Sequence, residues 1–128
     1  MTGTVSAGTE LLRLADLPDG ATREFILGSG DWPPSGFVVR LGDEIHAWFN
    51  RCPHALRPLN AMPDRFLTPG GGLIQCAAHG AQFEKATGLC IAGPCLDESL
   101  RRIAVRVVNG AILLDEDLDL AKLERWPR

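Results

Sequence analysis

The stretch that decides the fold runs from Asn50 to Leu96 and reads NRCPHALRPLNAMPDRFLTPGGGLIQCAAHGAQFEKATGLCIAGPCL. It is dense in Pro, Gly and Cys, and its one clear strand pattern is Leu73-Ile-Gln75. Two short segments within it each combine a thiol with an imidazole, and these are Cys52-Pro-His54 and Cys76-Ala-Ala-His79. The candidate chemistry of the chain therefore lies in this stretch.

The sequence before this stretch predicts three β-strands. Thr22 to Leu27 reads as a strand and is followed by a loop from Gly28 to Gly36. Two further β-rich runs, Phe37 to Leu41 and Ile45 to Phe49, flank the short connection Gly42-Asp-Glu44. This pattern is typical of a β-hairpin.

The sequence after this stretch predicts a second hairpin. Arg102 to Val108 and Ala111 to Leu114 are joined by Asn109-Gly110, a pair that readily adopts the positive φ angles of a tight turn. In the first of these strands, alternate apolar residues share one face, and they are Ile103, Val105 and Val107. The charged tail from Asp115 to Arg128 carries three leucines spaced for one or two helical turns, namely Leu118, Leu120 and Leu123.

Composition limits the class of protein. With 128 residues, 45% of them apolar, the chain is long enough for one domain with a hydrophobic core. No apolar run approaches the roughly 18 residues that a membrane helix needs, so no membrane span is expected. The first ten residues lack a basic segment followed by an apolar one, which favours a cytoplasmic protein. A net charge of −3 disfavours nucleic acid as a partner.

The two thiol and imidazole segments resemble the boxes of the Rieske iron–sulfur family, C-x-H and C-x-x-H-G, which are 21 residues apart here. The resemblance covers most of the chain, from about Leu11 to Leu114. It implies an all-β fold, in which a Rieske-type antiparallel β-sandwich or barrel base carries a smaller cluster-binding subdomain. Further matching residues are Phe83, Thr87-Gly88, Gly93-Pro94 and Leu100. We expect a single domain over 1–128, with base strands in about 10–49 and 97–114, the subdomain in about 50–96 and the charged tail in 115–128.

The resemblance implies a Rieske-type [2Fe–2S] cluster, with Cys52 and Cys76 on one iron and His54 and His79 on the other. Each loop would supply one soft anionic thiolate and one neutral imidazole. Two thiolates neutralise the +2 charge of two ferric ions and two sulfides, whereas four would leave −2. Reduction then costs less, and the potential rises from about −400 mV to roughly −150 to +300 mV.

A structural Cys₂His₂ zinc site uses the same four side chains and is the chief alternative. Its usual first spacing places two to four residues between the first two ligands. The single residue between Cys52 and His54 is too short for both side chains to reach one metal comfortably. The spacing therefore favours ligands directed at two irons.

The resemblance also indicates the surroundings of the cluster. In high-potential members, two further cysteines form a disulfide, and a Ser and a Tyr donate hydrogen bonds to the sulfurs. The matching positions here are Arg57 and Ala78, then Ala81 and Phe83. Without these donors, we expect a potential of about −150 mV. The segment Gly93-Pro94 is expected to cover the cluster and to bring Cys95 near the irons without ligating them, and Pro53 and Gly80 complete the expected environment.

Other candidate residues have simpler interpretations. Cys90 and Cys95 could form a disulfide or a redox-sensing pair, but two small buried thiols in a reduced compartment are the ordinary interpretation. His46 is expected to be a strand side chain rather than a ligand. Arg51 and Arg57 fit a basic docking rim and plain solvated charges equally well.

The resemblance favours a stand-alone ferredoxin, a one-electron carrier between a flavin-containing reductase and a ring-hydroxylating oxygenase or similar acceptor. It is not expected to be an enzyme, because a mononuclear oxygenase iron needs two histidines and a carboxylate. Only His46 remains once the cluster ligands are assigned. The alternatives are a small Rieske subunit, resembling that of assimilatory nitrite reductase, and a redox-sensing module based on Cys90 and Cys95.

Overall fold

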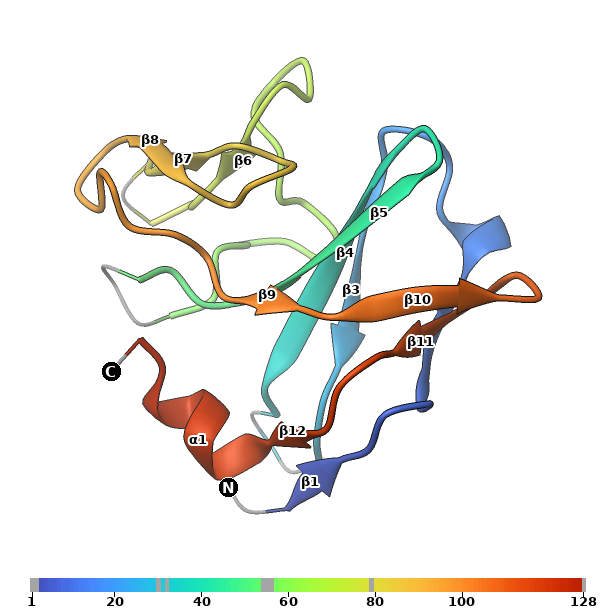
Figure 1. The fold of residues 1–128 in the computed structure, drawn as a ribbon. Helices are drawn as coiled ribbons and strands as arrows, with labels where there is room; N and C mark the ends of the chain where they lie inside the picture. The colour runs from blue at the N-terminus through green and yellow to red at the C-terminus, as the bar shows by residue number, and fades with distance from the viewer. Residues whose placement is uncertain (1–2, 30, 32, 54–56, 79, 128) are drawn as a thin grey trace.

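The computed structural model describes residues 3–29, 31, 33–53, 57–78 and 80–127, and these are mostly antiparallel β-structure (Figure 1). The expected all-β class is confirmed. Within the described residues the strands form four sheets, in the orders β3-β4-β5-β9, β10-β11-β2, β6-β7-β8 and β1-β12. The elements are β1 (Thr4–Val5), β2 (Glu10–Arg13), a 3-10 turn (Leu14–Asp16), β3 (Thr22–Ile26), β4 (Ser35–Leu41), β5 (Glu44–Phe49), β6 (Ile74–Gln75), β7 (Gln82–Phe83), β8 (Cys90–Ala92), β9 (Arg102–Ile103), β10 (Val105–Val108), β11 (Ala111–Leu114), β12 (Leu118–Asp119) and α1 (Leu120–Arg125).

Both predicted hairpins are confirmed. β4 pairs with β5, and β10 pairs with β11 across Asn109 and Gly110, whose φ angles are 50° and 78°. The predicted loop through Gly36 is wrong at its end, because Gly36 lies in β4 opposite Phe25. A Cβ at Gly36 would lie only 2.4 Å from the Phe25 ring. The glycine is thus a packing requirement within a strand rather than a loop signal.

The predicted strand from Arg102 to Val108 is two strands in different sheets. β9 pairs with β5, whereas β10 pairs with β11. The backbone N–H of Ala104, at the break, donates to the Glu116 carboxylate at 2.8 Å. Because the sheet changes at this point, Ile103 is buried while Val107 is 43% exposed, so the predicted common face is wrong for Val107.

The sheet β3-β4-β5-β9, which we call the central sheet, is covered on both faces. Successive side chains of a strand point to opposite faces, so alternate residues of β4 and β5 enter different hydrophobic cores. One core lies against residues 50–96, which we call the arm region, and the other lies against β11 and α1. Figure 1 shows the arm region and the β10-β11 hairpin on opposite sides of β4 and β5. The first core receives Phe37, Val39 and Trp48, and the second receives Val38, Ala47 and Phe49.

An aromatic stack joins the arm region to the central sheet. The Phe66 ring lies 4.1 Å from the Phe37 ring, with 10° between their planes, and both are buried. The arm region contains β6, β7 and β8, of which only β6 was predicted. β7 and β8 have two and three residues, too few for an alternating pattern to be recognised.

The tail forms the predicted helical turns. α1 begins after Asp119, whose carboxylate accepts hydrogen bonds from the backbone N–H groups of Ala121 and Lys122. Leu120 and Leu123 are buried against the base. Within the part of the chain that the structure describes, no helix has the length and hydrophobicity to cross a membrane.

The buried side chain of Asn50 connects the end of β5 to the arm region. Its Oδ1 accepts a hydrogen bond from the backbone N–H of Leu59 at 2.9 Å. Its Nδ2 lies 2.9 Å from Asn60 Oδ1, 3.1 Å from Ser35 Oγ and 3.2 Å from Glu24 Oε2. The residues that follow the first thiol segment are therefore fixed to β3 and β4.

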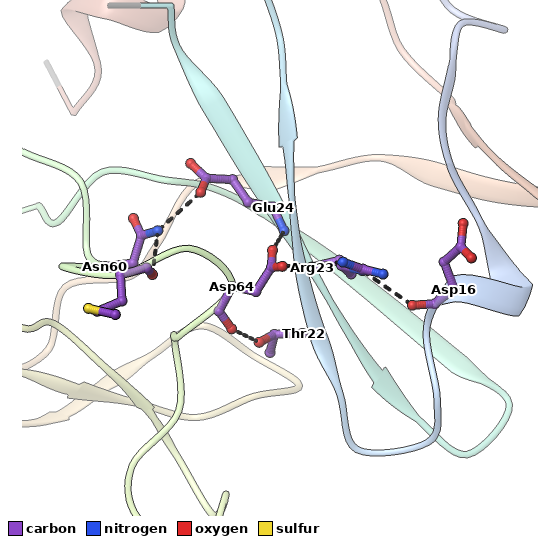
Figure 2. Close-up of polar contacts among 7 residues, drawn as sticks. Asp16, Thr22, Arg23, Glu24, Asn60 and Asp64 are labelled. Atoms are coloured by element: carbon purple, nitrogen blue, oxygen red, sulfur yellow. Dashed lines mark hydrogen bonds and ion pairs between the residues drawn. The ribbon is translucent and has the colours of Figure 1, made fainter.

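Asp64 strengthens this connection along the edge of β3, as Figure 2 shows. Its Oδ1 accepts from the backbone N–H of Glu24 at 2.8 Å, and its backbone carbonyl accepts from Thr22 Oγ1 at 2.8 Å. Its second carboxylate oxygen forms an ion pair with Arg23 at 3.3 Å. Asn60 Nδ2 also donates to Glu24 Oε1 at 3.0 Å. β3 thus uses its outer edge to hold the loop of residues 60–64.

We predict that Asn50→Ala lowers the free energy of unfolding by about 2–3 kcal/mol, because it leaves buried donors and acceptors without partners. Chemical denaturation followed by tryptophan fluorescence measures this loss. Asn109→Gly is the matched control, because Asn109 is exposed and glycine readily adopts its positive φ. A loss for Asn50→Ala no greater than that for Asn109→Gly would contradict the connecting role.

Candidate iron–sulfur site

Each of the two thiol segments is closed by a backbone hydrogen bond, and the two bonds are equivalent. In the first arm, residues 52–57, the N–H of Cys52 donates to the carbonyl of Arg57 at 2.8 Å. In the second arm, residues 76–81, the N–H of Cys76 donates to the carbonyl of Ala81 at 2.8 Å. Each arm therefore begins at a cysteine and is closed five residues later.

A further backbone hydrogen bond joins the second arm to the segment that follows the first arm. The N–H of Ala77 donates to the carbonyl of Leu59 at 2.7 Å, and the N–H of Leu59 donates to Asn50 Oδ1. Leu59 is fully buried between them. The second arm is thus held to the segment after the first, which is held to the central sheet.

The structure brings part of the candidate site into one buried group. Cys52 and Cys76 are both 0% exposed, and they share a hydrophobic core with Ala81, Phe83 and Cys95. Pro53 is also buried. The expected ligands His54 and His79 lie outside the described residues.

Gly80 fulfils a conformational requirement of the second box. Its φ is 70°, in the left-handed region that glycine adopts at little cost. Its N–H donates to the carbonyl of Cys76 at 2.9 Å, which forms the turn. After this turn the chain enters the core at Ala81, so the glycine reverses the chain between the exposed tip and the buried β7.

The segment Gly93-Pro94-Cys95 packs against the second arm. Gly93 has a φ of 100°, and a Cβ there would lie 2.7 Å from Ala81 Cα. Only a glycine allows this approach of the two backbones. Pro94 is exposed, whereas Cys95 is 2% exposed and points into the core with Cys52.

Cys90 and Cys95 are adjacent thiols. Their Sγ atoms lie 3.2 Å apart, and all four cysteines of the chain, each within the described residues, are outside disulfides. Burial raises the pKa of the Cys95 thiol, and the neighbouring Cys90 and Cys52 side chains raise it further. The ordinary interpretation of Cys90 and Cys95 as buried thiols agrees with this geometry.

The positions that match the Ser, the Tyr and the disulfide cysteines of high-potential Rieske proteins differ in exposure. Ala81 and Phe83 are fully buried and can donate no side-chain hydrogen bond to a sulfur. Arg57 and Ala78 are exposed at the outer end of the arms. They line a hollow of about 330 Å³ whose other lining residues are Pro58, Asn60, Ala61 and Ala77.

Arg51 is a structural residue rather than part of a rim. Its guanidinium donates to the backbone carbonyls of Glu124 and Trp126, and it lies 5.4 Å from the centre of the Phe49 ring. These contacts attach the end of α1 and the residue that follows it to the start of the first arm. Of the two arginines considered for a docking rim, Arg57 is the exposed one.

His46 lies in β5, as expected, with both ring nitrogens engaged. Arg102 Nη1 is 3.1 Å from Nδ1, and Glu44 Oε1 is 2.9 Å from Nε2. Because a guanidinium can only donate, Nδ1 is the acceptor and Nε2 carries the proton that faces Glu44.

Sequence reasoning missed the residues that position the first arm, namely Glu24, Ser35, Asn50, Asn60 and Asp64. They are scattered over forty positions of the chain and belong to no motif. The one sequence signal for these contacts was Asn50, which directly follows a predicted strand. Its burial, which makes it a structural residue, is known only from the fold.

The donor set fits an iron–sulfur centre. Two deeply buried thiols, presented by two equivalently closed arms, are the soft ligands that such a centre requires. A small antiparallel β-fold with this pair of arms is typical of iron–sulfur domains whose cysteine ligands lie on two loops.

Residues 9–114 match the Rieske [2Fe-2S] domain family, and the chain belongs to that family. It therefore binds a Rieske-type [2Fe–2S] cluster. The chain is 33% identical over 58 residues to Ferredoxin CarAc of Metapseudomonas resinovorans. The matched residues make up 45% of this chain and 50% of the length of that curated relative.

Solved structures share the fold. The ferredoxin of carbazole 1,9a-dioxygenase from Nocardioides aromaticivorans IC177 is 26% identical, with a TM-score of 0.65 over 87% of this chain and 99% of that one. The Sphingomonas yanoikuyae B1 ferredoxin is 24% identical, with a TM-score of 0.65 over 85% and 98% of the two chains.

We predict that Gly93→Ala lowers the free energy of unfolding by about 1–3 kcal/mol, because it adds a clash with the Ala81 backbone and strain at a positive φ. The matched control is Gly72→Ala, since a Cβ at Gly72 meets nothing within 4 Å and its φ is ordinary. Thermal unfolding of the two variants gives the comparison. Equal stability of both variants would show that the close approach of Gly93 to Ala81 is unimportant.

Proposed function

We propose that this chain is a one-electron carrier whose cluster is held by Cys52 and Cys76 on one iron and by His54 and His79 on the other. The observation that supports it most strongly is the pair of arms, each closed by the same hydrogen bond and each beginning at a fully buried cysteine. The family supplies the identity of the bound group. The two histidines complete the C-x-H and C-x-x-H-G boxes.

The chemistry that the cluster supplies is the reversible uptake of one electron. Cys52 and Cys76 contribute two thiolate charges in a site that excludes water, and these neutralise the metal–sulfide core. Neutral imidazoles on the second iron add no charge. This ligand set therefore avoids a net charge in the buried site, which a set of four thiolates would leave.

The sequence holds one histidine beyond the two boxes, whereas a mononuclear oxygenase iron needs two. The one histidine outside the boxes, His46, is engaged with Glu44 and Arg102 on β5. A mononuclear iron would need a second histidine as well. The proposed activity is therefore electron transfer as a component of an oxidoreductase system.

We propose a flavin-containing reductase as the electron donor and a terminal oxygenase or similar acceptor as the partner. The similar ferredoxin from Nocardioides aromaticivorans is a component of a dioxygenase, which supports an acceptor of this class. The hollow between the arms, with Arg57 at its edge, suits an acidic group of a partner. The proposal takes residues 1–128 as one domain acting in the cytoplasm, where thiols such as Cys90 and Cys95 remain reduced.

We predict that anaerobic reconstitution gives about two irons and two labile sulfides per chain and a one-electron reductive titration. Cys52→Ala and Cys76→Ala should each abolish cluster loading, because each removes a thiolate ligand. Cys90→Ala is the matched control, since Cys90 is equally buried in the same region but lies outside the boxes. Iron and sulfide analysis with visible absorption measures loading.

Two results would contradict the proposed function. One is a colourless protein that takes up one zinc ion through the same cysteines, which would favour the structural zinc site. The other is full cluster loading in Cys52→Ala or Cys76→Ala, which would show that the replaced cysteine is not a ligand.

We predict a midpoint potential of about −150 mV, at the low end of the Rieske range. The buried residues Ala81 and Phe83 present no hydroxyl to the cluster sulfurs, so the more negative reduced state lacks these two donors. Protein-film voltammetry measures the midpoint. A value above zero would show that other donors compensate for the missing hydroxyls.

A further inference from the structure

Residues 115–127, which we call the C-terminal strap, lie beyond the domain that matches the Rieske family. The strap is anchored to the base. Its strand β12 pairs with β1, with Leu118 opposite Val5. Leu120 and Leu123 of α1 are buried in the core of the base. The strap is therefore fixed well enough to support a neighbouring segment.

Arg51, the residue directly before Cys52, connects the strap to the first arm. Its Nη1 donates to the backbone carbonyl of Glu124 and, at 3.1 Å, to that of Trp126. The guanidinium also lies 5.4 Å from the centre of the Phe49 ring, and the Trp126 ring meets that ring edge-on at 6.1 Å. In Figure 1, the chain that follows α1 turns back towards this part of the arm region. Arg51 thus joins two carbonyls of the strap to the residue that precedes the candidate ligand.

The chemistry of the guanidinium suits this connection. The last carbonyls of a helix have no partner within the helix and lie at the negative end of its dipole, which attracts a cation. One guanidinium nitrogen carries two hydrogens, and here it donates to both carbonyls. The flat guanidinium also stacks on an aromatic ring, which a compact ammonium group does less well. We therefore expect lysine to replace Arg51 only in part.

A hollow of about 480 Å³ lies beside this connection. Its lining includes Arg51, Glu124, Pro58 and Asn60, so its walls come from the end of α1 and from both sides of the first arm. Side chains that face a hollow lack packing partners on that side. The hydrogen bonds of Arg51 therefore contribute much of the attachment between the strap and the arm. The far end of the first arm has its own support, which is Asn50.

We infer that Arg51 is a positioning residue for the cluster, because it fixes the start of the first arm to the C-terminal strap and so holds the Cys52 thiolate in place. This inference rests on the assignment of Cys52 as a ligand under the proposed function. Local opening of an arm exposes the cluster to solvent without unfolding the whole chain. Arg51 should therefore slow the loss of the cluster.

The test measures how fast the reconstituted full chain loses its visible absorption in excess EDTA. Arg51→Met keeps the apolar stem but removes the donors, and it should lose the cluster about tenfold faster, the effect of losing one hydrogen bond from a charged group. Arg51→Lys keeps the charge and the donors, so its rate should lie between the two. Arg125→Met is the matched control, because Arg125 is an exposed arginine at the end of α1, and it should match the native chain.

Two further readouts separate positioning from a general loss of stability. Trp126→Ala weakens the same contact from the side of the strap. If both residues act through this contact, the double variant Arg51→Met/Trp126→Ala should lose its cluster no faster than the faster single variant. The electron paramagnetic resonance spectrum of the reduced protein should also shift in Arg51→Met, because the Cys52 ligand moves, and should be unchanged in Arg125→Met.

A native rate of cluster loss in Arg51→Met would overturn the inference. So would rate increases that multiply in the double variant while the resonance spectrum stays native, because that pattern indicates two independent losses of stability. Where Arg51→Met does not fold, Trp126→Ala decides: a faster loss than in Arg125→Met supports the inference, and an equal rate contradicts it.

The resonance spectrum of the native chain tests the cluster type alone. A native spectrum that is not of the Rieske type overturns the proposed function, and the inference with it. A Rieske-type native spectrum, together with native rates in Arg51→Met and Trp126→Ala, overturns the inference alone.

Discussion

The hydrogen bonds of Asn50 are the constraint on which the position of both arms depends. The Asn50 side chain holds the backbone N–H of Leu59, and the carbonyl of Leu59 holds the N–H of Ala77 in the second arm. One buried amide thus fixes two loops that are remote in sequence. Because Asn50 directly follows β5, its hydrogen bonds fix the arms to the rigid central sheet. A metal site needs its ligands held in such precise positions.

The central sheet can serve this purpose because both of its faces are buried. β4 and β5 place alternate side chains into the base core and into the core beneath the arms. The Phe37 ring, stacked on Phe66, and Val38, directed to the base, are neighbours in sequence with separate structural roles. The arm region is therefore packed against the base by apolar contacts and attached to its edge by the Asp64 contacts with β3.

Particular residues show why the sequence predicted some features and not others. The boxes around Cys52 and Cys76 and the Asn109-Gly110 turn were recognisable because their chemistry depends on local spacing. Gly36 was misread because a strand glycine that accommodates the Phe25 ring looks like a loop glycine until the partner is known. The contacts of Asn50, and of Cys95 with Cys90, depend on tertiary packing, which no short pattern encodes.

In the proposed site, two cysteines hold one iron and two histidines hold the other. Electron–nuclear double resonance on the reduced protein, labelled with ¹⁵N in histidine, tests it most directly. We predict strong couplings from two histidine nitrogens bound to the reduced iron. Only one such coupling is expected in His54→Cys or His79→Cys protein that retains a cluster. The absence of any histidine nitrogen coupling in a loaded native protein would contradict it.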